Sequence, residues 1–420
     1  MAANSLWSQY LNALKTNYAK ITRLDFLQPD GSVAFSLDNN PYGVRSKTFI
    51  QDGSLSVNLQ NGTRRTASVR LSNLNGEYDY NVNNVWFGQQ IRILMGMILP
   101  NGHEYLIPQG VFYIQNPEEN QQPGERTAVY NLVDKWAYLD GTLNGELEGA
   151  YECPVNSNIF GAVDAILKLP LGNGKEIDSV PATYTDFYNG KFTTLPDGST
   201  VPLTNTPYTV RVDSDHNTYA DVILALNEML AGWIGYDAYG SLRLDPSQDD
   251  ILDTNKPIEW TFSPSEQEFL GATYTVLNSE VRNDIIRVGE SLGGYALIGA
   301  RAQNYDPSSD TNINLIGLKT DRESKAGYYT NDICASLAEF ELKRKTILKK
   351  SITIRSKQMF HLEENNLVLI KRTDKPGQPM ERHLVTGFNI PLTSTGEMTI
   401  NATSVSDFPI ATISYLTNQS

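Results

Sequence analysis

The chain has 420 residues, a formal net charge of −14 and a pI of about 4.8, and its residues are 40% hydrophobic and 20% charged. This composition is typical of a folded protein and excludes an intrinsically disordered chain. The charge is spread along the sequence, and the basic patch by which proteins grip nucleic acid is absent, which argues against a nucleic-acid-binding protein.

The first segment, residues 1–20, predicts an amphipathic helix over about residues 4–19, which Asn4 or Ser5 can cap. Its apolar side chains recur at three- and four-residue spacing, as on one face of a helix: Leu6, Trp7, Tyr10, Leu11, Leu14 and Tyr18. This stripe lies outside any predicted domain, so it needs an apolar surface to pack on. The chain itself or a neighbouring subunit can supply that surface.

Residues 21–142 show the alternation of apolar and polar residues that is typical of strands with one buried face. The clearest pattern is a hairpin over residues 54–71, whose turn contains Asn61 and Gly62, two residues that tolerate a positive φ. Further strands are expected at residues 21–27, 32–37, 91–99, 110–115 and 127–133, with a polar loop over 116–124.

Residues 143–265 predict a mixed α/β region. One helix begins after Ser157 and stops near Pro170, and a second begins at Thr218, where Asp221 completes a capping box. A hairpin over residues 232–244 follows the second helix and is expected to pack against it.

Residues 266–410 return to strands, expected at 284–290, 350–355, 366–372, 383–389 and 397–403. One helix interrupts them, from near Thr330 to the basic run 343–345, where cations favour a helix C-terminus. Residues 411–420 are expected to form a C-terminal tail. The predicted fold class is therefore α+β and β-dominated, with two sheet units on either side of a mixed α/β region.

No pattern in the sequence points to a catalytic, cofactor-binding or metal site. The histidines share no helix face and lack the close spacing of metal ligands: His103, His216, His361 and His383. Cys153 and Cys334 are too far apart for a metal-binding knuckle, and Cys334 is expected to be a small core residue. We therefore predict a protein that is not an enzyme and has no cofactor.

Three acidic pairs are interpreted as solvated turn residues rather than as the carboxylates of a glycosidase: Glu118–Glu119, Asp249–Asp250 and Glu363–Glu364. The glycine-rich run 289–294 is interpreted as a hairpin turn, because no helix follows it to form a phosphate cradle. No leader peptide and no apolar run of membrane-spanning length is apparent, so membrane insertion is not expected.

Four segments, in their order along the chain, resemble tail proteins of phages of Gram-positive hosts: residues 143–160, 217–245, 283–290 and 398–403. The order of units over about residues 21–410 is similar to that of the baseplate hub family, which includes the hub of phage T4. The resemblance implies two tail-tube-like β domains, at residues 21–142 and 266–410, and a peripheral region at 143–265.

The resemblance also implies a role. Three subunits would form a homotrimeric ring with pseudo-sixfold symmetry that joins the tail tube to the tail tip. Its expected partners are the tail tube or a distal tail protein above, a tape-measure protein in the lumen, and tip, spike, fibre or receptor-binding proteins below. DNA would pass without specific binding, and the chain would be assembled in the host cytoplasm and reside in the virion. An acidic channel wall would repel the DNA phosphates, in keeping with the net charge of −14.

Two other functions remain open at this stage. A receptor- or carbohydrate-binding adhesin is suggested by aromatic residues in the loop-rich middle region, Tyr184, Phe187 and Tyr188, which are expected to be exposed. A tail-associated cell-wall hydrolase would need a cleft with convergent carboxylates or a metal.

Overall fold

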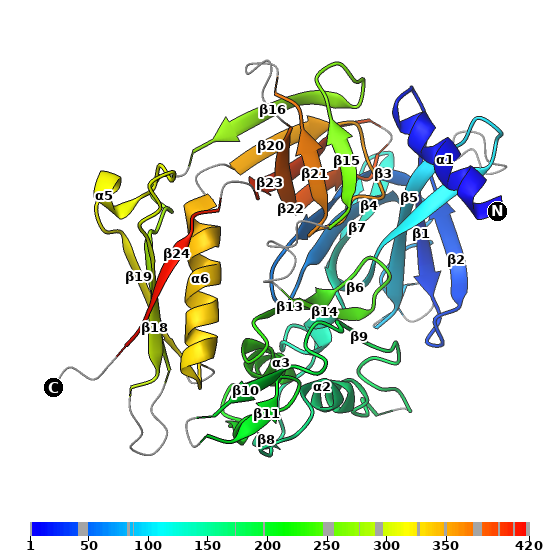
Figure 1. The fold of residues 1–420 in the computed structure, drawn as a ribbon. Helices are drawn as coiled ribbons and strands as arrows, with labels where there is room; N and C mark the ends of the chain where they lie inside the picture. The colour runs from blue at the N-terminus through cyan, green and yellow to red at the C-terminus, as the bar shows by residue number, and fades with distance from the viewer. Residues whose placement is uncertain are drawn as a thin grey trace.

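The computed structural model describes residues 2–40, 49–81, 85–86, 88–172, 174–195, 198–246, 256–276, 278–289, 297–325, 328–347, 351–372, 380–393, 395–405 and 408–416. In this part of the chain, strands dominate and form one large sheet, one four-stranded sheet and several small ones. Figure 1 shows the large sheet beside the four-stranded sheet, with the mixed middle region below both.

Strands from both ends of the chain build the large sheet. The N-terminal half contributes β1 (Ala19–Leu27), β2 (Val33–Asp38), β3 (Ile50–Asn58), β4 (Arg65–Ser72), β5 (Gln90–Ile98), β6 (Glu104–Gln122) and β7 (Glu125–Asp134). The C-terminal half contributes β15 (Ile258–Phe262), β16 (Phe269–Thr275), β20 (Ser351–Ser356), β21 (Leu367–Ile370), β22 (Glu381–Pro391) and β23 (Met398–Ser404). The strand order is β16-β20-β23-β22-β3-β4-β7-β6-β5-β1-β2, and β21 joins β15 to β22. The two predicted sheet units thus share one continuous sheet.

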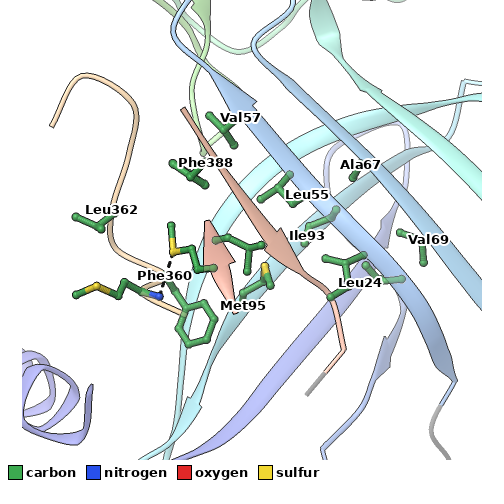
Figure 2. Close-up of a cluster of buried hydrophobic side chains, with 14 of the residues drawn as sticks. Leu24, Leu55, Val57, Ala67, Val69, Ile93, Met95, Phe360, Leu362 and Phe388 are labelled. Carbon is green, nitrogen blue, oxygen red and sulfur yellow. Dashed lines mark hydrogen bonds between the residues drawn. The ribbon is translucent and has the colours of Figure 1, made fainter. Parts of the chain in front are cut away.

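The apolar residues that alternate with polar ones in the sequence are the buried residues of the strands in this sheet. In β4, Ala67, Val69 and Leu71 are buried and the residues between them are turned outward. Buried side chains from both halves meet in one core, where Leu55 and Ile93 lie close to Phe388 and Phe360 (Figure 2). A single core of this kind makes the two halves dependent on each other for their stability.

Two segments of the large sheet differ from the prediction. The polar stretch 116–124 is not a loop but the end of a long β6–β7 hairpin, which pairs out to Gln122 and Glu125. A bulge with Asn116 at φ 47° lets β6 bend there and continue with polar residues exposed on both faces, so no apolar alternation marks it. β15, at residues that were assigned to the middle region without a predicted strand, pairs in parallel with β21 and belongs to the large sheet.

The middle region holds α2 (Ile159–Leu167), α3 (Tyr219–Glu228) and the short strands β8 (Tyr151–Cys153), β9 (Thr183–Tyr184), β10 (Phe192–Thr194), β11 (Thr200–Pro202), β12 (Val210–Val212), β13 (Gly232–Tyr236) and β14 (Leu242–Pro246). A short 3-10 helix, η1 (Lys135–Tyr138), leads into it from β7. The capping box of Thr218 and Asp221 is present at α3, whereas the cap of α2 is Asn158 rather than Ser157. The predicted hairpin is β13–β14, and it packs with α3 in a separate core.

The four-stranded sheet has the order β19-β17-β18-β24 and consists of β17 (Asp284–Gly289), β18 (Gly299–Asn304), β19 (Thr320–Lys325) and β24 (Ala411–Tyr415). The short helix α5 (Ile313–Ile316) lies at one end, and the predicted helix is α6 (Asn331–Ile347). α6 stands between this sheet and the rest of the molecule (Figure 1). Its Phe340 packs on Leu367 and Leu384 of the large sheet, while Ala338 and Leu342 pack on β17 and β18.

The predicted C-terminal tail is wrong for residues 411–415, because they form β24 and pair with β18 over five residues. The segment Ala-Thr-Ile-Ser-Tyr has the β-branched and aromatic residues of a strand, but it is too short for its alternation to be noticed. The predicted strand at 284–290 exists as β17, and it lies in the four-stranded sheet between β18 and β19.

Candidate assembly site between the two β units

The site most informative about function is the seam where the two halves of the large sheet meet. β3 and β22 pair antiparallel there, with Val57 opposite Phe388 and Leu55 opposite Ile390. Glycine is required on the β22 side, because a Cβ on Gly387 would lie 2.5 Å from the Val57 carbonyl oxygen. The seam therefore depends on full backbone pairing and close approach, as between neighbouring strands of one domain.

A buried ion cluster fastens the seam on the core side. Glu364, in the turn before β21, accepts a 2.5 Å bond from Arg65 Nη2 and lies 3.7 Å from Arg64 Nη1. Arg65 also donates to the Gln109 carbonyl, and its side chain is 1% exposed. Asp134 accepts hydrogen bonds from the backbone nitrogens of Arg64 and Arg65 at 2.8 and 2.9 Å, which orients both residues. The prediction that Glu363–Glu364 is a solvated pair is therefore wrong for Glu364.

The reason for this difference is the long-range partner. A carboxylate buried without a cation would be strongly unfavourable, but two arginines 299 and 300 positions away in the sequence lie against Glu364. Glu363 lies beside the pair in a polar cavity of about 110 Å³, and burial raises the pKa of its carboxyl group. The Glu364 carboxylate thus joins the C-terminal half of the large sheet to Arg64 and Arg65 of the N-terminal half.

The N-terminal helix α1 (Ala2–Leu14) crosses from one half to the other. Tyr10 is fully buried; its hydroxyl lies 2.9 Å from His361 Nδ1 and accepts a 3.1 Å hydrogen bond from the Phe360 backbone nitrogen. Trp7 and Tyr10 stack with ring centroids 5.4 Å apart, and both meet the His361 ring edge-on. The sequence left open whether this apolar stripe packs on its own chain or on a neighbouring subunit. The described side chains of the stripe pack on their own chain. The helix ends at Leu14, five residues earlier than predicted.

The opposite face of the central strands is polar and mostly uncharged. From β16 to β4, the outward positions face one another in register as Thr273–Thr353, Thr353–Asn401, Asn389–Ser56 and Ser56–Thr66. Asn389, Asn401, Thr66 and Thr273 are exposed. We call these positions the hydroxyl–amide face: Thr273, Thr353, Asn401, Asn389, Ser56, Thr66 and Ser68. Two arginines lie on the same side, and each has a carboxylate beside it: Arg70 is paired in register with Asp52, and Arg355 lies 3.4 Å from Glu397. The few charges on this face therefore balance.

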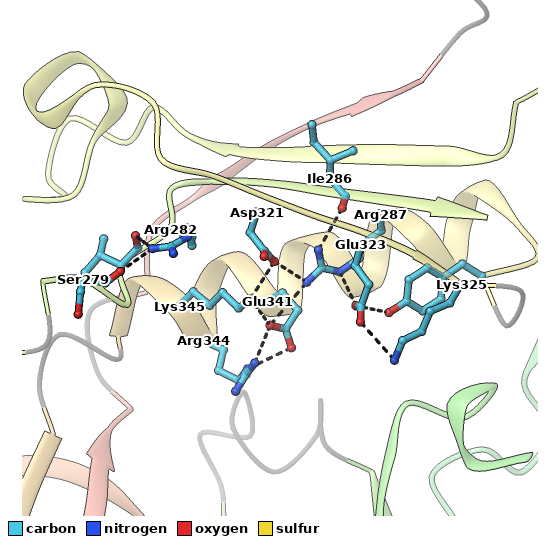
Figure 3. Close-up of polar contacts among 12 residues, drawn as sticks. Ser279, Arg282, Ile286, Arg287, Asp321, Glu323, Lys325, Glu341, Arg344 and Lys345 are labelled. Carbon is cyan, nitrogen blue, oxygen red and sulfur yellow. Dashed lines mark hydrogen bonds and ion pairs between the residues drawn. The ribbon is translucent and has the colours of Figure 1, made fainter. Parts of the chain in front are cut away.

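A second polar region lies between α6, β19 and the middle region, in a cleft of about 520 Å³. The buried Arg287 donates to Asp321 at 3.0 Å and lies 3.5 and 3.8 Å from Glu323 and Glu341 (Figure 3). Lys325 bridges the cleft to Glu228 of α3 at 3.1 Å. Cations and carboxylates alternate along the wall and neutralise one another, so the network holds the four-stranded sheet against α6 and the middle region.

The histidines of the sequence are not brought together. His103 and His216 are exposed, whereas His361 and His383 are buried in different places. In the described ranges, no three His, Cys, Asp or Glu side chains are grouped as a metal site. Cys153 and Cys334 are both buried with free thiols, and Cys334 packs on Ile298 and Ala300 as a small core residue.

The acidic pairs and the glycine-rich run have different outcomes. Glu118 and Glu119 are exposed as expected, but on β6 rather than in a loop. Asp249 and Asp250, and residues 290–294 of the glycine-rich run, lie outside the described residues. Among the helices that the structure describes, none is long and apolar enough to cross a membrane.

The aromatic residues that suggested an adhesin are buried or partly buried. Tyr188 is 5% exposed, and its hydroxyl donates to the Leu230 carbonyl at 2.6 Å. Phe187 packs edge-on against Tyr188, and Tyr184 stacks on Phe160 at 4.5 Å between ring centroids. The prediction of exposure is wrong for Tyr188, whereas Tyr184 and Phe187 are partly buried where they pack against the core of the middle region.

No protein-family model matches the sequence, and no curated protein matches it. A tail protein from Neisseria meningitidis MC58 has a similar structure, with a TM-score of 0.58 and 10% identity over 92% of this chain and 97% of that chain. This chain has the fold of phage tail proteins.

Two further structures agree. The 43 kDa tail protein of prophage MuSo2 from Shewanella oneidensis has a TM-score of 0.55 and 11% identity, over 91% of this chain and 98% of that chain. Prophage tail protein gp18 from Listeria monocytogenes EGD-e has a TM-score of 0.52 and 10% identity, over 92% and 94%. The phage-tail fold thus spans nearly the whole chain, and the predicted β-dominated fold class is confirmed.

Proposed function

We propose that this phage-tail-fold protein is the hub of a phage tail, a ring of three copies that joins the tail tube to the tail tip and encloses the channel for DNA. The observation that carries the proposal is the seam, since one copy places two β units side by side in one sheet. Three such copies around one axis present six units, which matches a six-fold tube on one side and a three-fold tip on the other.

The ends of the large sheet suit a ring. The strand path ends in β2, from the N-terminal half, and in β16, from the C-terminal half. Contacts of different surfaces on successive copies are head-to-tail, and they close into a ring when the rotation allows. Exposed apolar side chains lie on both end strands, Val33 on β2 and Leu270 and Tyr274 on β16, and ring contacts would bury them.

The hydroxyl–amide face fits the channel wall. Lysine and arginine on a wall would bind DNA phosphates through counterion release, whereas serine, threonine and asparagine hold water and offer no such attraction. A channel wall built from this face would be neutral. The net charge of the chain had instead suggested an acidic wall. Both kinds of wall let DNA pass without specific binding.

The role is structural and not enzymatic, with the chain in the tail of the virion after assembly in the host cytoplasm. The tube or a distal tail protein would sit above the ring, a tape-measure protein inside it, and tip, spike or fibre proteins below. The adhesin alternative is weakened, since Tyr188 is buried and Tyr184 and Phe187 are partly buried against the core of the middle region.

The test of the proposal is the number of copies per assembly. The chain has a mass of 46.7 kDa, so three copies amount to about 140 kDa, which light scattering coupled to size-exclusion chromatography would measure. Electron microscopy of tails should show three copies at the tip in a ring with an open centre. One copy per tail, or a closed centre, would overturn the proposal.

The channel wall is tested separately. In phage carrying Ser56→Lys with Asn401→Lys, tails should assemble but deliver DNA more slowly, because two added cations per copy hold phosphates. The neutral control Ser56→Gln with Asn401→Gln has side chains of intermediate length and no charge, and it should deliver DNA normally. Equal delivery by both variants would mean that another face lines the channel.

A further inference from the structure

β24 is an outer strand of the four-stranded sheet, and among the described residues it pairs with β18 along one edge only. Its hydrogen-bond phase follows from the Leu416 nitrogen, which donates to the Gly299 carbonyl at 2.9 Å, together with the antiparallel register of β24 on β18. In an antiparallel pair only alternate residues bond to the neighbouring strand. Thr412 and Ser414 therefore bond to β18, and the backbone groups of Ala411, Ile413 and Tyr415 point away from it.

These outward groups meet nothing in the described part of the chain. β24 is the last strand of its sheet, and the backbone N–H and C=O groups of Ala411, Ile413 and Tyr415 have no hydrogen-bond partner among the described residues. The side chains flanking the edge are apolar and exposed, at 40% for Ile413, 55% for Tyr415 and 77% for the preceding Ile410. An open edge with apolar side chains is a template for another strand.

The other end strands of the two larger sheets carry features that discourage strand addition. β2, β15 and β16 are each irregular against their neighbour, and β16 has Gly271 at its irregularity. β19 carries four charged residues among six: Asp321, Arg322, Glu323 and Lys325. β24 has no charge, no proline and a regular register, so it lacks every one of these protections.

We propose that β24 is a docking edge for an extended strand of a different tail protein, which adds to the four-stranded sheet beside Ile413 and Tyr415. Strand addition of this kind gains affinity from backbone hydrogen bonds and specificity from alternate side chains. The guest strand carries uncharged, apolar residues at the alternate positions that face Ile413 and Tyr415.

The symmetry of the proposed ring, on which this choice of partner rests, argues against a second copy of β24 as the guest. Two identical edges that pair antiparallel are related by a two-fold axis. A ring of three copies has no such axis, so two β24 edges of one ring cannot pair with each other in this way, and a strand of another protein is the partner that we propose.

Hydrogen exchange at single amides tests the proposal in the isolated ring and in complete tails. In the isolated ring, the amides of Ile413 and Tyr415 should exchange about 100-fold faster than those of Thr412 and Ser414, which are bonded to β18. In complete tails the two outward amides should slow to the rate of the inward ones. Fast exchange in tails would overturn the proposal, and so would protection already present in the isolated ring, which would indicate a second copy.

Three substitutions, two of them matched prolines, give a second measurement. Ile413→Pro removes an outward N–H and is compatible with an edge strand, so the purified protein should keep its melting temperature and its ring while tail assembly falls at least about tenfold. Ser414→Pro removes an inward N–H and should lower the melting temperature. Ile413→Lys keeps the backbone intact and should block assembly through its charge. Normal assembly with both Ile413 variants would overturn the proposal, while a missing ring in the unsubstituted protein would instead count against the hub.

Discussion

The ion cluster at the seam makes a quantitative prediction for Glu364→Ala. The substitution leaves Arg65 buried beside Arg64 without its carboxylate, while the hydrogen bond from Arg65 to the Gln109 carbonyl remains. Removal of one partner from a buried pair costs about 3–5 kcal/mol, far above the value of the pair itself, because the other charge stays desolvated. Because about 1.4 kcal/mol corresponds to a tenfold change, the equilibrium constant for folding should fall by a factor of roughly 10² to 10³·⁵.

The assay is urea-induced unfolding of the purified protein, followed by tryptophan fluorescence. A matched control is Glu397→Ala, which removes an exposed partner 3.4 Å from Arg355, with side chains 58% and 46% exposed. That change should cost less than about 1 kcal/mol. Replacement of both members of the buried pair, Arg65→Met with Glu364→Leu, should recover much of the loss. Equal losses for Glu364→Ala and the control would refute the reasoning that the cluster fastens the seam.

Three further predictions concern buried side chains in the core of the large sheet and in the core of the middle region. Tyr10→Phe removes the hydroxyl shared by His361 and the Phe360 nitrogen, and should cost about 1–3 kcal/mol in urea unfolding. Burial lowers the pKa of His361 to about 4, below the usual 6.5, so the unfolded chain takes up a proton first as the pH falls. Stability that is fully present above pH 6.5 should thus decrease by up to about 3 kcal/mol towards pH 4, and His361→Phe should flatten this dependence in unfolding curves measured at each pH. Tyr188→Ala should cost about 3–5 kcal/mol through the lost core contact, whereas Tyr188→Phe, which loses only the bond to Leu230, should cost about 1 kcal/mol; binding of labelled Tyr188→Phe to host cells should match that of the unsubstituted protein.

Local signals in the sequence were sufficient where a segment carries its own partner. Thr218 and Asp221 cap α3 through bonds within one turn, and the Asn61-Gly62 turn sets β3 against β4. The α+β, β-dominated fold class follows from many such segments. The hydroxyl–amide face is also visible as the polar half of the same alternation, although nothing in the sequence tells which strands carry it side by side.

The candidate site could not be predicted, because its partners are far apart in the chain. Nothing near Glu364 indicates burial, since both cations that neutralise it come from residues 64 and 65. The pairing of β3 with β22 leaves no mark on either strand except Gly387, whose role appears only with its neighbour in place. β24 was missed because five residues are too few for an alternating pattern, and its pairing with β18 spans more than a hundred residues.

The seam has a consequence for the time course of synthesis. Residues 50–58 leave the ribosome long before residues 381–391, so β3 has one paired edge and one open edge while most of the chain is made. Arg65 is also synthesised long before its partner Glu364, 299 positions later, and Tyr10 long before His361, 351 positions later. Contacts of such separation form slowly, and an unpaired edge invites association with other nascent chains. Folding of this protein is thus completed by its last hundred residues, and truncation before β22 should yield an aggregating chain rather than half of a stable molecule.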